Sequence, residues 1–256
     1  MNDSEIETII HHISEDLSAL GVRRGGVLLV HSSLRSLGYV PGGAETVIRG
    51  LLHALGEEGT LLLPSLSYDH ATPQNPYFDI RRTPSNVGAI AEYFRQRPGT
   101  LRSMHPTHSV CGTGGLAQTL LEKHHLDSTP CGEYSPFHLL PIYKGQIIML
   151  GCGLLPNTSM HAIEEMVVPP YLFNETLLTY RLVDSEGRVT EKEYRTHNFE
   201  GWRQRYDRVG SILSEPSLRE GKVLQAHCHL IDAAALWQAA LPALKQNPLY
   251  FVDAIG

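Results

Sequence analysis

The sequence predicts an α/β fold, an α/β/α sandwich with a mainly central sheet, plus a small C-terminal region that contains a β-hairpin. Three short apolar runs, at residues 26–31, 60–64 and 146–151, are typical of strands buried on both faces. Amphipathic helical patterns alternate with these runs, as in α/β proteins. After residue 170, two strand patterns flank a Ser-Glu-Gly-Arg turn, which predicts the hairpin.

The amino-terminal half alternates regularly between helix and strand. Apolar residues from Ile6 to Leu20 recur at helical spacing, and Gly21 is placed to end that helix. The run 26–31 then opens into polar residues, as a central strand does at its carboxyl end, where α/β sheets carry their chemistry. A second amphipathic helix ends at Gly56 before the run 60–64, so these segments form a strand-helix-strand unit.

The second half of the chain begins after a loop rich in Pro, Asn and Asp. The elements predicted there are a helix at 85–97, strands at 108–112, 146–151, 176–184 and 189–195, and helices at 201–213 and 232–245. No internal repeat or long linker divides them. We therefore expect residues 1–256 to form a single domain.

Composition restricts the class of partner. Of 256 residues, 42% are hydrophobic and 19% are charged, which is typical of a globular protein. The net charge of -6, from 27 acidic and 21 basic residues, argues against nucleic acid and favours a cationic or neutral ligand. No apolar run reaches the roughly 18 residues of a membrane helix. The four cysteines are far apart, so we expect reduced thiols in a cytoplasmic protein. We also expect a monomer or homodimer, without a membrane partner.

The first candidate site follows the strand 26–31. The segment from His31 to Arg35, with Gly38 and Val40 shortly after it, places main-chain N–H groups, two hydroxyls and a guanidinium at a strand end. Such groups hold a phosphate or an extended polar chain. The alternative is a hydrogen-bonded turn that caps the next helix, and this segment alone does not decide between the two.

A second segment carries two histidines three residues apart, His105 and His108, next to Ser109. Pro106 bars a regular helix through the pair, so we expect a loop that runs into a strand. Two histidines alone make a weak metal site, and two polar loop residues are the simpler interpretation.

The third candidate lies where the strand 146–151 leads into a helix. His161 and Glu164 are three residues apart and share a helix face, so the carboxylate can orient the imidazole. A positioned imidazole is a typical general base. Taken alone, the pair also fits a first helical turn with acidic residues placed against the helix dipole.

Taken together, these segments resemble the aminoglycoside 3-N-acetyltransferase family over roughly residues 5 to 200. The ordered set is far more specific than any of its parts. The matching residues are His31, Ser32, Ser33, Leu34, Gly38, Gly42, Gly43, Gly59, Thr60, Leu61, Pro64, Asp79, Thr83, Pro84, Ser85, Gly88, Arg102, His105, Pro106, Ser109, Gly132, Ser135, Pro136, Leu150, Gly151, Asn157, Thr158, Ser159, His161 and Glu164.

The resemblance implies a single acetyltransferase domain that moves the acetyl group of acetyl-coenzyme A to an amine, of the 3-N position type, on an aminoglycoside or related amino sugar. It implies that His161 is the general base in direct transfer, that Glu164 assists it, and that His31 lies close to the transfer centre. It calls for acetyl-coenzyme A as cosubstrate and for no metal. The residues it assigns to the coenzyme are Ser32, Ser33, Leu34, Arg35, Gly38, Val40 and Ser109.

The chemistry of the residues agrees with that assignment. An ammonium acceptor must lose a proton before its nitrogen attacks a thioester, a step that suits His161. The tetrahedral oxyanion needs donors, for which we consider the backbone and hydroxyls of Ser32 and Ser33. Acidic residues would attract a polycationic acceptor, and the candidates are Asp69, Asp79 and Glu165.

Two other functions compete with acetyl transfer. One is a metal-dependent hydrolase that uses His31, His105, His108 and His161 with Glu164, which would require three or four ligands to converge. The other is a non-catalytic module that binds coenzyme A or a nucleotide. Cys152 as an acyl-accepting nucleophile is a weaker alternative, because a small cysteine after a strand usually packs.

Overall fold

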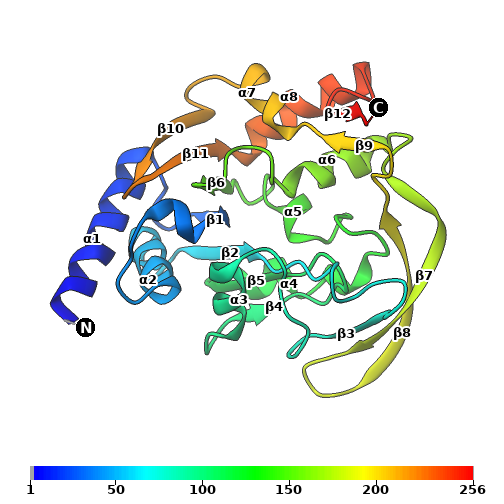
Figure 1. Ribbon diagram of the computed structural model, residues 1–256, viewed down its shortest axis with the longest axis horizontal. Helices are drawn as coiled ribbons and strands as arrows, with labels where there is room; N and C mark the ends of the chain where they lie inside the picture. The colour runs from blue at the N-terminus through cyan, green and yellow to red at the C-terminus, as the bar shows by residue number, and fades with distance from the viewer. Residues whose placement is uncertain (1–2, 256) are drawn as a thin grey trace.

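A seven-stranded mixed sheet forms the centre of the computed structural model, which describes residues 3–255 (Figure 1). Its strands are, in spatial order, β10 (Leu218–Val223), β11 (Ala226–Asp232), β6 (Gln146–Leu150), β1 (Val27–Ser32), β2 (Thr60–Pro64), β5 (Val110–Gly114) and β4 (Leu101–Arg102). β1 is parallel to both β2 and β6, and the outer pairs are antiparallel. The apolar runs of the sequence are thus the three central parallel strands.

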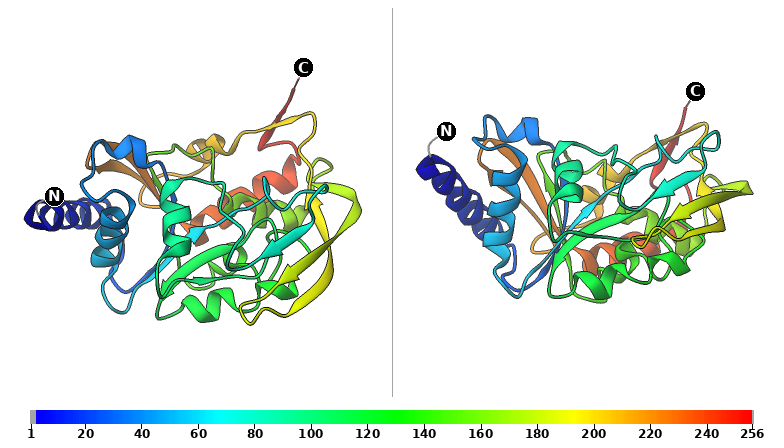
Figure 2. Two further views of the ribbon diagram at one scale, coloured as in Figure 1. Left: turned by 60° about the horizontal axis from the view of Figure 1, so that its bottom comes forward. Right: turned by 90° about the horizontal axis from the view of Figure 1, so that it is seen from below.

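Helices cover both faces of this sheet, which confirms the α/β/α sandwich. One face is covered by α1 (Asp3–Leu20), α2 (Ala44–Leu55) and α3 (Ala89–Gln96), and the other by α4 (Ala117–Leu121), α5 (Pro136–Leu139), α6 (Ser159–Val167) and α8 (Ala233–Gln246). The alternation of β1 shows the two layers, since Leu28 and Val30 pack into the first core and Val27 and Leu29 into the second. In Figure 2, α1 and α2 lie on one side of the sheet and α8 on the other. None of the helices within residues 3–255 has the length and apolarity that crossing a bilayer requires.

A second, smaller sheet contains the predicted hairpin. Its strands are β3 (Tyr77–Asp79), β7 (Phe173–Val183) and β8 (Val189–His197). The carboxylate of Asp184 closes the turn by accepting the main-chain N–H groups of Glu186 and Arg188 at 2.8 and 2.9 Å. The long hairpin lies along one edge of the molecule (Figure 1). The end of β8 contacts α6, in one of the helical layers of the main sheet.

The prediction of a helix at 201–213 is wrong for most of these residues. The chain there forms β9 (Trp202–Gln204), the 3-10 turn η3 (Tyr206–Arg208) and the short helix α7 (Val209–Ile212). Gly201 has φ of 78°, outside the helical region, and β9 pairs with β12 (Val252–Ala254) instead of coiling. Tertiary pairing with the carboxyl terminus therefore overrides the local helical pattern.

The other differences are smaller. The helix predicted from residue 85 begins at Ala89, because Gly88 has φ of 111° and Ser85 donates its main-chain N–H to the Glu92 carboxylate. The strand expected at 108–112 is β5, shifted by two residues. The β10–β11 hairpin was not predicted, because its outer strand buries only its first and last residues, Leu218 and Val223. The remaining short turns are η1 (Leu34–Leu37) and η2 (His124–Leu126).

Phe94 gives a direct test of the first core. Its ring on α3 has no exposed surface and packs against the sheet. We expect Phe94→Ala to lower the free energy of unfolding by about 3–5 kcal/mol, because it removes apolar contacts and leaves a cavity. Urea denaturation measures this change. The control is Tyr93→Ala on the same helix, where 46% of the side chain is exposed, and equal losses in both variants would contradict the packing.

Buried histidines make stability depend on pH, and His124 isolates the effect. Burial lowers the pKa of His124 from 6.5 to about 3. Between these values the unfolded chain binds a proton that the folded chain excludes, so stability present at pH 7 is lost as the pH falls. We expect His124→Asn to reduce the loss of unfolding free energy between pH 7 and pH 5 by about 2 kcal/mol. The control His12→Asn, at an exposed position, should lose as much unfolding free energy between pH 7 and pH 5 as the wild type. If His124→Asn also lost as much as the wild type, burial of His124 would not have the effect described.

Candidate active site

A cleft of about 500 Å³ opens between the small sheet and the helical layer that carries α6. Loops after β2 and before β5 and α6 complete its wall. Its lining includes Leu66, Tyr68, Thr107, His108, Asn157, Thr158, His161, Tyr180, His197, Phe199 and Tyr206. The cleft therefore joins residues of the small sheet to loops that flank strands of the main sheet, and His161 is the predicted catalytic residue that lines it.

His161 and Glu164 form the predicted pair on α6. The Nδ1 atom of His161 lies 2.8 Å from Oε2 of Glu164, and the carboxylate side chain has no exposed surface. A carboxylate is only an acceptor, so Nδ1 carries the hydrogen and Nε2 keeps the lone pair. The pair thus presents a fixed acceptor nitrogen to the cleft.

Two tyrosines hold the Glu164 carboxylate, and sequence reasoning missed both. The hydroxyl of Tyr171 donates to Oε1 at 2.7 Å. The hydroxyl of Tyr206, in η3, donates to Oε2 at 2.7 Å and lies 3.0 Å from Nδ1 of His161. Burial raises the pKa of both phenols, so they remain neutral donors. No local pattern marks Tyr206, because it reaches Glu164 from 42 residues away.

The loops after β1 and β6 meet at the carboxyl end of the sheet, as the parallel strands predict. Ser33 donates its main-chain N–H to the Leu150 carbonyl at 2.9 Å. The Ser36 hydroxyl donates to the Gly151 carbonyl at 2.7 Å and lies 2.9 Å from the Ser33 hydroxyl. Gly151 has φ of 72°, and a Cβ there would lie 2.6 Å from that of Ser36. The Ser33 main-chain N–H is therefore occupied, which corrects its expected place among the oxyanion donors.

His31 ends β1 beside these loops. Its side chain is buried, and its Nε2 atom has no hydrogen-bond partner within residues 3–255. Burial lowers the pKa of His31 to about 3, and the charge that His161 can carry adds to this shift. His31 is therefore neutral at physiological pH and lies within electrostatic reach of His161.

The residues assigned to the coenzyme divide into two groups. Ser32, Ser33 and Leu34 are partly exposed from the end of β1 into η1, and Arg35 in η1 is exposed. Gly38 ends the turn with φ of 83°. Val40 instead packs into the first core. Ser109 is fully buried, where its hydroxyl donates to the Ser65 carbonyl at 2.7 Å and accepts from Arg102 at 2.9 Å. The structure thus brings the first group to an accessible loop and places the side chains of Val40 and Ser109 in the interior.

The three expected acceptor acids lie in different surroundings. Asp69 is exposed on the loop beside Tyr68. Asp79 is buried, and its Oδ1 accepts main-chain N–H groups of Arg81 and Arg82 at 2.9 and 3.1 Å, which closes a turn. Glu165 is also buried, and burial raises its pKa to about 7. Asp69 is therefore the one of the three that solvent and a ligand can reach directly.

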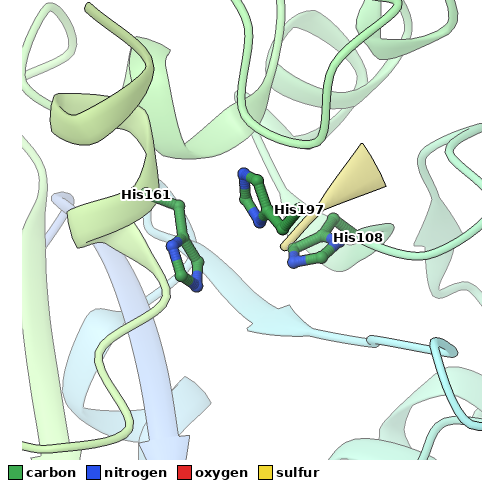
Figure 3. A group of neighbouring side chains, drawn as sticks. All are labelled: His108, His161 and His197. Carbon is green, nitrogen blue, oxygen red and sulfur yellow. The ribbon is translucent and has the colours of Figure 1, made fainter. Parts of the chain in front are cut away.

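Two further histidines border the cleft beside His161 (Figure 3). The His197 ring lies 4.5 Å from that of His161, centroid to centroid, and its Nε2 atom is 3.0 Å from Oε1 of Glu165. The His108 ring lies 5.0 Å from that of His197. His197 was not predicted as a site residue, because it is the fold of the hairpin that brings it close to α6. Burial lowers the pKa of His108 and His197 well below the usual range.

Two alternatives from the sequence lose support in this geometry. His105 turns away into the core, where its Nδ1 accepts the main-chain N–H of His108 at 3.0 Å and its ring stacks on that of His124. The four histidines that the hydrolase interpretation requires therefore do not converge into one set of metal ligands. Burial raises the pKa of the Cys152 thiol to about 12, so Cys152 is a poor nucleophile at neutral pH.

The sequence of this chain is similar to those of known acetyltransferases. A family model described as aminoglycoside 3-N-acetyltransferase matches residues 29–245. The SPbeta prophage-derived aminoglycoside N(3')-acetyltransferase-like protein YokD of Bacillus subtilis (strain 168) is 32% identical over 252 residues, which cover 88% of this chain and 90% of that protein.

Solved structures agree in fold. Aminoglycoside acetyltransferase AAC(3)-IVa, as a histidine-to-alanine variant in complex with a gentamicin, superposes with a TM-score of 0.77 at 30% identity, covering 93% of this chain and 89% of that one. AAC-IIIb, in a binary complex with CoASH, gives a TM-score of 0.78 at 26% identity and covers 91% and 95%. The chain belongs to the aminoglycoside 3-N-acetyltransferase family.

Proposed function

We propose that this protein transfers the acetyl group of acetyl-coenzyme A to an amine, of the 3-N position type, on an aminoglycoside or related amino sugar. Family membership supports the reaction class, and relatives bound to CoASH and to a gentamicin support the two substrates. The observation that carries the proposal is the His161–Glu164 pair, held by two tyrosines at the wall of the cleft.

His161 acts as the general base. Glu164 accepts the Nδ1 hydrogen, so the Nε2 lone pair takes a proton from the acceptor ammonium. The amine nitrogen then attacks the thioester carbonyl, and collapse of the tetrahedral intermediate expels the coenzyme thiolate, which the imidazolium protonates. The nitrogen loses its second proton to solvent as the amide forms, so the reaction releases one proton in all. Glu164 stabilises the imidazolium that forms between these steps, as a buried carboxylate does in other base–acid pairs.

The loop from Ser32 to Gly38 holds the coenzyme. Its hydroxyls and the Arg35 guanidinium lie at the carboxyl end of β1, next to His31 and the loop that leads to His161. The pantetheine arm and phosphates would run along this loop, which leads the thioester toward His161. Val40 and Ser109 support the loop and the sheet from the interior, and the Ser32 hydroxyl remains available to the oxyanion.

The acceptor enters the cleft from the side of Tyr68 and Asp69. Tyr68 is 47% exposed and lines the cleft, and Asp69 adds an accessible carboxylate beside it. An amino sugar combines a ring that packs on an aromatic face with ammonium groups that a carboxylate attracts. Asp79 and Glu165 act behind this surface, through the turn and through His197.

We further propose that residues 1–256 act as one acetyltransferase domain in the cytoplasm, as a monomer or homodimer. The cleft takes its lining from the small sheet, from α6 and from loops that flank main-sheet strands, between Leu66 and Tyr206, which favours one unit. All four cysteines are thiols, as a reducing compartment predicts.

The general base is tested by His161→Asn. We expect turnover to fall by at least about 100-fold while affinity for acetyl-coenzyme A stays within a few fold, because the change removes proton transfer and leaves the coenzyme loop intact. A thiol-release assay with gentamicin measures turnover, and calorimetry measures affinity. His227→Asn, a substitution at an exposed position on β11, is the control. Undiminished turnover in His161→Asn would exclude the assigned base.

The coenzyme loop is tested by replacing Ser32 and Ser33 together with alanine. We expect the dissociation constant for acetyl-coenzyme A to rise by about 10-fold, the loss expected for one or two hydrogen bonds. The exposed Ser211→Ala serves as the control. If affinity stayed constant and turnover alone fell, the two serines would be oxyanion donors and the coenzyme would lie elsewhere.

A further inference from the structure

Three imidazoles converge at the cleft from segments far apart in the chain. His108 precedes β5, His161 lies on α6 and His197 ends β8 (Figure 3). One ring nitrogen of each lies within 4.8 Å of those of the other two. All three side chains are almost fully buried. Acetyl transfer requires one of these rings as a base, so the convergence of two more needs its own explanation.

The second nitrogen of each ring is already engaged. Nδ1 of His161 bonds to Glu164 at 2.8 Å, and Nε2 of His197 bonds to Glu165 at 3.0 Å. Nδ1 of His108 lies 2.9 Å from the Thr107 hydroxyl. Imidazoles that ligate metals almost always have the remote nitrogen held by a carboxylate, carbonyl or similar group, which fixes ring and tautomer. The nitrogens that remain available are Nε2 of His161, Nδ1 of His197 and Nε2 of His108.

The spacing fits a tetrahedral ion after a small closure. Zinc binds imidazole nitrogen at 2.0–2.1 Å, which sets two tetrahedral ligands about 3.4 Å apart. One nitrogen of each ring already lies within 4.8 Å of the others, so side-chain rotation is what must bring the three available nitrogens to that separation. Three histidines with an open fourth position form a common zinc arrangement, and imidazole also suits cobalt, nickel and copper. Two carboxylates behind the rings, Glu164 and Glu165, offset the charge of the ion.

We propose that His108, His161 and His197 form a binding site for a divalent transition-metal ion of the zinc class, with the fourth position open to the cleft. The ion occupies the His161 lone pair. This has a consequence that rests on the proposed function. If His161 is the base, the metal-loaded protein cannot deprotonate an acceptor. The site is then an inhibitory one that competes with the acceptor ammonium for the same nitrogen.

A second potential ligand group must be removed before the site is tested. Glu220, His227 and His229 also place ligand atoms within 4.8 Å of one another, on the β10–β11 hairpin. This group is largely exposed, and its side chains form part of the outer sheet edge. The experiment therefore uses protein in which His227→Ala and His229→Ala eliminate it.

Cobalt reports both binding and geometry. We expect metal-stripped protein with the two surface substitutions to bind one Co²⁺ per chain and to develop the intense visible bands of four-coordinate cobalt. Adding either His108→Ala or His197→Ala should abolish these bands, because two imidazoles do not form the tetrahedral set. Weak six-coordinate spectra, or bands that persist in His108→Ala, would overturn the proposal.

Glu165→Gln tests the support behind His197 without removing a ligand. The amide keeps the volume of the carboxylate and loses its charge, so we expect Co²⁺ and Zn²⁺ affinity to fall about 10–100-fold by calorimetric titration. Glu122→Gln, at an exposed position after α4 that lines the same surface cavity as Glu165, is the matched control and should leave affinity unchanged. Equal affinity in both variants would exclude Glu165 as the support and argue against the ligand set.

Turnover separates this proposal from the proposed function. Zn²⁺ should stop acetyl transfer by the metal-free enzyme, and a chelator should restore it. The His108→Ala protein, compared with its own metal-free rate, should resist the same Zn²⁺ concentration. Cobalt bands with no turnover in metal-free protein would defeat the proposed function and leave the metal site established, whereas turnover that Zn²⁺ does not affect would contradict the inhibitory site.

Discussion

The geometry of the cleft depends on one buried carboxylate. Glu164 has no exposed surface, and an isolated charge in such a place would cost several kcal/mol. It is stabilised because it accepts hydrogen bonds from Tyr171 and Tyr206 while it pairs with His161. Since Tyr206 lies in η3, the chain after Gly201 must follow a path that carries this hydroxyl to α6. A continuous helix from 201 to 213 would not provide that path, and the carboxylate is thus the link between the site and the fold around it.

This dependence explains what the sequence could and could not predict. The strands β1, β2 and β6 are predictable because each is buried on both faces and so is apolar at nearly every position. The His161–Glu164 pair is predictable because helical spacing alone brings the two residues together. Tyr206 and His197 carry no such local signal, since their neighbours in space are set by the hairpin and by the pairing of β9 with β12. Tyr171 lies seven residues from Glu164 but beyond the end of α6, so helical spacing does not bring the two together. The β10–β11 hairpin is a local pairing, but only the first and last residues of β10 are buried, so its sequence shows no clear alternation.

The two sheets have different tasks in this arrangement. The carboxyl ends of β1 and β6 bring the Ser33 loop and the loop before α6 into direct hydrogen-bond contact, which sets the position of the loop proposed to hold the coenzyme relative to α6. The small sheet adds the opposite wall of the cleft, with Tyr180 and His197. Its hairpin can vary in length and side chains without disturbing the parallel core, because β7 and β8 build a separate hydrophobic cluster around Phe78.

Charge is arranged for a cation, although histidines surround the centre. Burial lowers the pKa of His108 and His197 well below the usual range, so both rings are neutral at physiological pH and do not repel an ammonium group. The negative charge lies behind them, on Glu164. A cluster of neutral imidazoles backed by a carboxylate offers lone pairs to any cation that fits, whether an acceptor ammonium or a metal ion. What distinguishes the two is geometry, because an ammonium needs one nitrogen to take its proton, whereas a metal ion needs three nitrogens to close around it.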